Sequence, residues 1–171
     1  MAEVSKDPVL TPTAEMEAAI DQIVARYPEK RSASLMVLHT LQEEFGYLPQ
    51  SLVEWTAAKL ELQPINIHEI VTFYPMFRPY KVGKKMVRVC RTLSCALGGS
   101  KELHKGICER YGLDPEEGGP QTSSDGEVTV EFAECLASCG TAPVMMVDDQ
   151  MYESVRTEDA DGLINGGGKN A

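Results

Sequence analysis

The sequence predicts an α+β protein with a helical bundle in its first half and an α/β domain in its second half. Up to residue 80, apolar residues recur at the spacing of helices that bury one face. From residue 84 onward, short runs with alternating apolar residues, which are typical of strands, enclose one helical segment. Two pairs of cysteines follow the first two of these runs, so both pairs are expected at strand ends.

The first half contains predicted helices at residues 13–27, 32–45, 51–60 and 68–74. Thr13 is expected to cap the first helix and Gly46 to end the second, while Pro64 is expected to break the chain before the last one. His39 and His68 each stand alone, without a cysteine or carboxylate at ligand spacing. No metal site is therefore predicted in this half.

Residues 71–80 join the two halves and concentrate four aromatic side chains. This connector has two open interpretations, as part of the core or as an aromatic contact surface for a partner. The charged, glycine-containing segment 81–85 that follows marks a domain boundary. We therefore predict a helical domain with its connector at 13–80, a second domain at 81–164, and flexible ends at 1–12 and 165–171.

The second half has the predicted order strand, helix, strand, strand, strand, helix. Strands are expected at 84–90, 127–132, 142–147 and 150–152, and helices at 101–111 and 158–163. Ser100 and Thr157 are the expected caps of these helices. The helix between the first two strands makes them parallel, and the short turn between the last two makes them antiparallel. These connections are typical of a thioredoxin-like sheet.

Composition excludes several functional classes. The net charge of −10 argues against a nucleic-acid binder, which needs a basic surface. No apolar run of about 18 residues is present, so no direct membrane insertion is expected. The N-terminus lacks the features of a signal or transit peptide, so we expect a protein of the reducing cytoplasm. In that compartment, clustered cysteines more often hold metal or perform redox chemistry than form disulfides.

The two cysteine pairs predict a [2Fe–2S] cluster. Four residues separate Cys90 from Cys95, and three separate Cys135 from Cys139. Neither pair has the Cys-x-x-Cys spacing of a dithiol enzyme or of a typical zinc knuckle. One loop for each iron, with bridging sulfides, suits this layout better than one tetrahedral ion, although a zinc site and free thiols remain alternatives. A plant-type ferredoxin also uses four cysteines, but in another spacing.

Residues near the pairs have predicted supporting roles. Cys108 lies inside a predicted helix and is interpreted as a buried, unligated thiol. Arg88 and Arg91 flank Cys90 and are candidates to raise the reduction potential of a cluster by their positive charge. Glycines just beyond the cysteines would let backbone N–H groups approach the sulfurs, and they are Gly98, Gly99 and Gly140.

The cysteine motifs and their flanks resemble a known family. Cys90-x₄-Cys95, followed by Cys135-Leu136-x₂-Cys139 and Ala142-Pro143-Val144, is similar to the thioredoxin-like [2Fe–2S] subunit of NADH:quinone oxidoreductase, the E subunit of respiratory complex I. In the first half, Gly46-Tyr47-Leu48-Pro49 and the segment 71–77 resemble parts of the helical N-terminal domain of that family. The resemblance covers about residues 15–163.

The resemblance implies a function and a set of ligands. Cys90, Cys95, Cys135 and Cys139 would ligate one [2Fe–2S] cluster in a thioredoxin-like ferredoxin domain. The subunit would dock on a larger flavoprotein that holds FMN and binds NADH, and would exchange single electrons with the flavin. It would belong to the peripheral arm of the complex, on the cytoplasmic, inner face of the cytoplasmic membrane. The chain has no glycine-rich dinucleotide fingerprint, so it should not oxidise NADH alone.

Several alternatives remain open from the sequence. Closely similar subunits occur in NAD-reducing hydrogenases and NAD-dependent formate dehydrogenases. A free thioredoxin-like ferredoxin acting as a shuttle is another alternative, although the helices of residues 13–74 have no evident use in a shuttle. A zinc-stabilised adaptor without a redox role is the third.

Overall fold

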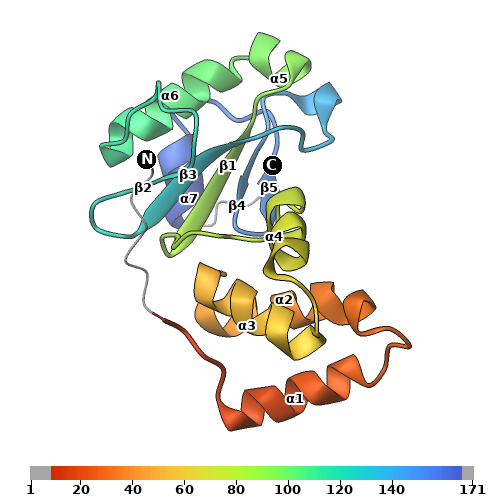
Figure 1. Cartoon of the computed structure of the whole chain (residues 1–171). Helices are drawn as coiled ribbons and strands as arrows, with labels where there is room; N and C mark the ends of the chain where they lie inside the picture. Colours follow the sequence, from red (N-terminus) through yellow and green to blue (C-terminus); the bar gives the residue numbers. More distant parts are fainter. Residues whose placement is uncertain (1–8, 167–171) are drawn as a thin grey trace. The chain divides into compact units, whose positions relative to one another are not determined.

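The first half of the chain folds into helices (Figure 1), and their apolar side chains form one core. The structure is a computed structural model that describes residues 9–166, and the chain divides into two units between Lys81 and Val82. The helices of the first unit are α1 (Ala14–Val24), α2 (Ser34–Phe45), α3 (Gln50–Leu60) and α4 (Pro64–Phe73), with a 3₁₀ turn η1 (Lys30–Ala33) before α2. Fully buried side chains at its centre include Ile20, Leu38, Leu41, Leu52 and Ile67.

In the first unit, Thr13 and Gly46 bound their helices as expected, whereas the start of α4 differs from the prediction. The Thr13 hydroxyl accepts a hydrogen bond from the Met16 N–H at 3.3 Å, and Gly46 ends α2 with φ of 80°. The predicted break at Pro64 is wrong, because α4 begins at this proline and not at His68. Proline suits the first turn of a helix, where its missing N–H would have had no intrahelical partner.

The aromatic connector contributes both to the core and to the surface. Phe77 is 4% exposed and belongs to the core of the first unit. The backbone N–H of Leu48 donates to the carbonyl of Arg78 at 2.7 Å, which ties the connector to the loop before α3. Phe73 and Met76, in contrast, remain exposed.

The second unit is built on a five-stranded sheet with the order β2-β3-β1-β4-β5 (Figure 1). Its strands are β1 (Lys85–Cys90), β2 (Gln121–Thr122), β3 (Val128–Ala133), β4 (Met145–Val147) and β5 (Gln150–Tyr152). The predicted parallel pairing of β1 with β3 and the predicted antiparallel hairpin of β4 with β5 are both confirmed. The edge strand β2 was not predicted, because two residues are too few to show an alternating pattern.

Alternation along the strands gives the sheet one apolar face. Val87, Val89 and Val130 point to a core shared with Leu103 and Ile107 of α6 (Ser100–Tyr111). Helix α7 (Ala160–Gly166) packs against α6 and closes the same core. The predicted α+β fold is thus confirmed. No helix among residues 9–166 is long and apolar enough to cross a membrane.

Two helix starts differ from the prediction. Helix α6 is capped by Gly99, which has φ of 98°, and Ser100 is already its first residue, with a buried hydroxyl that has no hydrogen-bond partner. Helix α7 begins at Ala160, two residues later than expected, and extends through Gly166. It therefore includes Asn165, which was expected in a flexible end. The rest of that end (167–171), and residues 1–8 of the other end, lie outside the described part of the chain.

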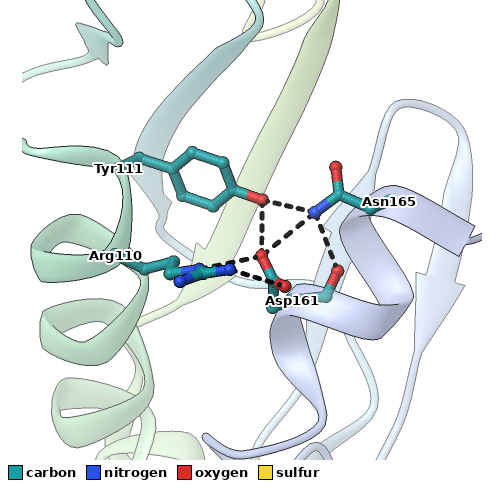
Figure 2. A network of polar contacts seen from close by, with 4 residues as sticks. All are labelled: Arg110, Tyr111, Asp161 and Asn165. Atoms are coloured by element: carbon teal, nitrogen blue, oxygen red, sulfur yellow. Dashed lines mark hydrogen bonds and ion pairs between the residues drawn. The ribbon is translucent and has the colours of Figure 1, made fainter.

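A polar network fastens α7 to α6 (Figure 2). The Tyr111 hydroxyl donates to Asp161 Oδ1 at 3.1 Å, and the Arg110 guanidinium pairs with both oxygens of the same carboxylate at 3.3 Å. Asn165 Nδ2 donates to the Tyr111 hydroxyl at 3.0 Å. These contacts hold the pKa of Asp161 below its ordinary value, first through the hydrogen bond from Arg110.

Candidate metal centre

The first cysteine pair is buried at the end of the central strand. Cys90 is the last residue of β1, where its backbone N–H donates to the carbonyl of Val144 at 3.0 Å. Cys95 lies on α5 (Leu93–Leu97), a short helix that the sequence did not predict. The two cysteines are 2% and 1% exposed, and Leu136 from the second cysteine loop packs against them.

The two buried sulfurs interact with each other. Burial would raise the pKa of the Cys90 thiol, but hydrogen bonds from Thr92, from the backbone near Leu136 and from Cys95 outweigh it and hold that pKa below its ordinary value. The Thr92 hydroxyl lies 3.3 Å from Cys90 Sγ. Burial and the neighbouring Cys90 sulfur raise the pKa of Cys95. The pair therefore favours the thiolate at Cys90 over that at Cys95, and thiolate is the form that binds metals.

The second cysteine pair lies in an exposed loop after β3. Cys135 Sγ accepts a hydrogen bond from the Ala137 N–H at 3.3 Å, and Ala137 adopts a left-handed conformation with φ of 57°. Cys139 begins the short 3₁₀ turn η2 (Cys139–Thr141), which packs beside α5. Both cysteines are exposed. An electrostatic interaction with Cys139 contributes to the raised pKa of Cys95, so the two side chains lie near each other.

The structure thus brings together both loops that carry the predicted ligands. Cys90 and Cys95 form one interacting pair, Cys139 acts on Cys95, and the exposed Cys135 accepts a hydrogen bond within its own loop. Within residues 9–166, no three side chains of His, Cys, Asp or Glu converge in a way that could hold a metal ion. Each iron of a binuclear cluster takes two protein thiolates, so the pair is the relevant unit. This all-sulfur donor set fits iron–sulfur chemistry, because soft thiolates select such clusters.

The two arginines near Cys90 are each paired with a carboxylate. Arg91 forms an exposed ion pair with Glu134, which directly precedes Cys135, so this pair links the two cysteine loops. Arg88 Nε lies 3.4 Å from Glu131 Oε1 across the parallel strands, without hydrogen-bond geometry at that nitrogen. Each positive charge therefore has a carboxylate close by, and the effect of these arginines on the reduction potential stays a prediction.

Cys108 is separate from the four cysteines. It is fully buried in α6, and burial raises the pKa of its thiol to about 11, so it remains protonated at neutral pH. Its sulfur lies 3.6 Å from His104 Nε2. The His104 ring stacks on Phe132 of β3 with 3.7 Å between ring centroids. The prediction of a buried thiol is confirmed.

The structure also gives physical roles to nearby glycines. A Cβ on Gly98 would lie 3.2 Å from the Cβ of Ala142, so this glycine allows α5 to approach the loop after η2. The left-handed φ of Gly99 is one that side chains disfavour. Gly140 has nothing within 4 Å of such a Cβ, so no close contact requires glycine there.

Sequence reasoning missed several residues that support the cysteine loops. Thr92 contacts a sulfur and is only two residues from Cys90, so its spacing was a usable signal. Glu153 is hydrogen-bonded to Ser138 and Thr141 in the second cysteine loop. It lies more than ten residues from both in the sequence, and no local pattern indicates this contact.

Comparison with known proteins agrees with this geometry. A family model described as thioredoxin-like [2Fe–2S] ferredoxin matches residues 20–167. The chain belongs to this family. The predicted [2Fe–2S] cofactor is thereby confirmed for this thioredoxin-like [2Fe–2S] ferredoxin.

Curated relatives of this ferredoxin are named as the E subunit of NADH-quinone oxidoreductase. The protein from Rickettsia felis is 37% identical over 85% of this chain and 86% of its own length. That from Mycobacterium tuberculosis is 34% identical over 89% of this chain, which spans only 59% of the mycobacterial protein. The resemblance to the E subunit is confirmed by these relatives.

Among solved structures, an NAD⁺-reducing [NiFe]-hydrogenase in the air-oxidised state shares the fold of this ferredoxin. The TM-score is 0.61 at 17% identity, over 74% of this chain and 22% of the hydrogenase chain. The same fold is therefore one segment of a much longer polypeptide in that enzyme.

Proposed function

We propose that this chain is the [2Fe–2S] electron-transfer subunit of the NADH-oxidising module of an NADH:quinone oxidoreductase. The observation that carries the proposal is that two cysteine loops meet at one end of the sheet, after the adjacent parallel strands β1 and β3. The similarity to E subunits over most of the chain supports the assignment to this module.

The proposed ligands are Cys90, Cys95, Cys135 and Cys139, with one pair on each iron. The cluster supplies one-electron transfer when it is bound. The chain contributes the surroundings of the sulfurs. The Thr92 hydroxyl and the Ala137 N–H contact Cys90 and Cys135, and both groups can stabilise a thiolate.

The proposed partner is a larger flavoprotein that holds FMN and binds NADH, because this chain has no dinucleotide fingerprint of its own. One quarter of the chain is charged, yet 92–100 and 135–147 contain no charged residue. On α5, Leu93 and Leu97 are 75% and 81% exposed although Cys95 between them is buried. An uncharged, apolar surface beside the cysteines is suited to being covered by a partner that exchanges electrons with the cluster.

The proposed host complex lies at the cytoplasmic, inner face of the cytoplasmic membrane, where this chain belongs to the peripheral arm. The chain is a subunit of the enzyme and does not oxidise NADH alone. The equivalent position in an NAD-reducing hydrogenase is the second candidate, because a hydrogenase chain contains the same fold. The subunits that co-purify with the chain from its native cells distinguish the two hosts.

The ligand assignment is tested by single cysteine variants of the full chain, purified without oxygen. Cys139→Ala is expected to lose most of its iron and sulfide and the paramagnetic resonance signal of the reduced cluster. Cys108→Ala is the matched control and is expected to keep them, because its protonated thiol is buried in a different core cluster from Cys90 and Cys95. Equal iron contents in the two variants would refute the assignment.

A further inference from the structure

Glu153 holds the second cysteine loop by its side chain. The residue follows β5, and its Oε1 accepts hydrogen bonds from the hydroxyls of Ser138 and Thr141, the latter at 2.7 Å. Ser138 directly precedes Cys139, and Thr141 ends the turn that Cys139 begins. The two hydroxyls also lie 2.8 Å from each other, so the carboxylate oxygen and both hydroxyls form one polar cluster around Cys139.

The backbone around Glu153 is anchored, which fixes the position of its carboxylate. Tyr152 and Val155 on either side are 4% and 5% exposed and belong to the core of the second unit. The Ser154 N–H donates to the carbonyl of Thr141 at 2.8 Å, and the Val155 N–H donates to the carbonyl of Pro143 at 3.0 Å. The segment 152–155 therefore runs along the cysteine loop as a fixed support.

Apart from the Arg91–Glu134 ion pair and the backbone hydrogen bonds from Ser154 and Val155, few contacts hold the shape of the loop. Cys135 and Cys139 are exposed, and Leu136 is the loop residue that packs against the buried first pair. The left-handed conformation of Ala137 is disfavoured for a residue with a side chain. Hydrogen bonds from outside the loop must therefore supply much of its order.

The charge of the Glu153 carboxylate bears on the reduction potential of the cluster. The hydrogen bonds from Ser138 and then Thr141 lower the pKa of Glu153, so its carboxylate is ionised at neutral pH. A fixed negative charge near a cluster opposes the addition of an electron, because reduction makes the cluster more negative. Within the described residues, no Lys, Arg or His forms an ion pair with Glu153 that would neutralise this charge.

We propose that Glu153 is a positioning residue that holds the Cys135–Cys139 loop in its cluster-binding shape and keeps the reduction potential of the cluster low. This inference rests on the proposed ligand role of Cys135 and Cys139. The residue acts through Ser138 and Thr141 and does not itself touch a cysteine sulfur.

The test uses the full chain with Glu153→Gln, which keeps one neutral acceptor, and Glu153→Ala, which keeps none. Glu117→Gln removes the same charge from an exposed loop away from the cysteines and is the matched control. Hydrogen exchange of residues 135–141 is measured in the cluster-free proteins. In the loaded proteins, the rate of cluster loss to an iron chelator and the reduction potential are measured.

Exchange in residues 135–141 and loss of the cluster are expected to become several-fold faster, more so in Glu153→Ala than in Glu153→Gln. The potential is expected to shift to more positive values in both, whereas Glu117→Gln matches the wild type. Wild-type exchange and cluster lifetimes in both Glu153 variants would overturn the positioning role, and an unchanged potential would overturn the electrostatic role. If even the wild type took up no cluster, the ligand assignment would fail, while the exchange data would still decide whether Glu153 orders the loop.

Discussion

The exposed leucines of α5 give a quantitative prediction about partner binding. Leu93 and Leu97 are 75% and 81% exposed. Burying a leucine side chain completely contributes about 1.5–3 kcal/mol, so covering the exposed part of each contributes about 1–2 kcal/mol. Alanine keeps the β-carbon, so Leu93→Ala combined with Leu97→Ala should cost somewhat less than the full sum, about 2–3 kcal/mol of binding free energy, or roughly a 30- to 150-fold increase in Kd.

The assay is anaerobic titration calorimetry of the cluster-loaded full chain against the purified flavoprotein that is proposed as its partner. Urea unfolding of the same variants should change by no more than about 0.5 kcal/mol, because exposed side chains contribute little to folding. Met36→Ala on α2, at a residue that is 46% exposed, is the control and should bind like the wild type. A double variant with unchanged Kd would refute the docking role of α5, and a large loss of folding stability would show that the leucines act within the fold.

Further predictions concern stability. The free energy of unfolding should fall as the pH drops below 6.5, because burial lowers the pKa of His104 and the unfolded chain therefore takes up the proton first. Urea titrations between about pH 7.5 and 5.5 measure this fall. A His104→Gln variant should lose less stability over the same range. Gly106→Ala should be destabilising, because the new Cβ would lie 2.4 Å from Thr157 Cγ2. Overpacking of this kind costs about 1–3 kcal/mol, whereas the gain in helix propensity is about 1 kcal/mol. The same change in a Thr157→Ala background should be stabilising. Asp161→Asn should weaken the α6–α7 contact at neutral pH and lower the stability of the protein. The difference in stability from the wild type should vanish as the pH falls through the lowered pKa of Asp161, and thermal unfolding across pH measures it.

Local signals in the sequence predicted some elements and missed others. Thr13 and Gly46 act within one turn of the helices that they bound, so their roles were predictable. Pro64 misled the prediction, because a proline ends a helix in its interior but starts one at its first turn. Helix α5 and strand β2 are shorter than the window in which a periodic pattern can be recognised.

The arginines near Cys90 show that the sequence does not reveal which carboxylates pair with a cation. The sequence places Arg88 and Arg91 beside a ligand candidate, which suggested a positive field at the cluster. In the structure, Glu131 and Glu134 come from the neighbouring strand β3 and its end, and they pair with these cations. The pairing depends on the register of two strands that are about forty residues apart, which charge spacing along the chain does not reveal.

The sequence by itself determined the order of four of the five strands and of all the α-helices except α5, the parallel pairing of β1 with β3, and a four-cysteine motif specific enough to indicate the cofactor. The tertiary structure alone decided that Cys95 is buried while the leucines around it are exposed, and that Glu153 supports the loop of Cys139. The physical reason is the range of the interactions. Periodicity, capping and ligand spacing act between near neighbours in the chain, whereas burial and side-chain pairing depend on which distant segment covers a residue.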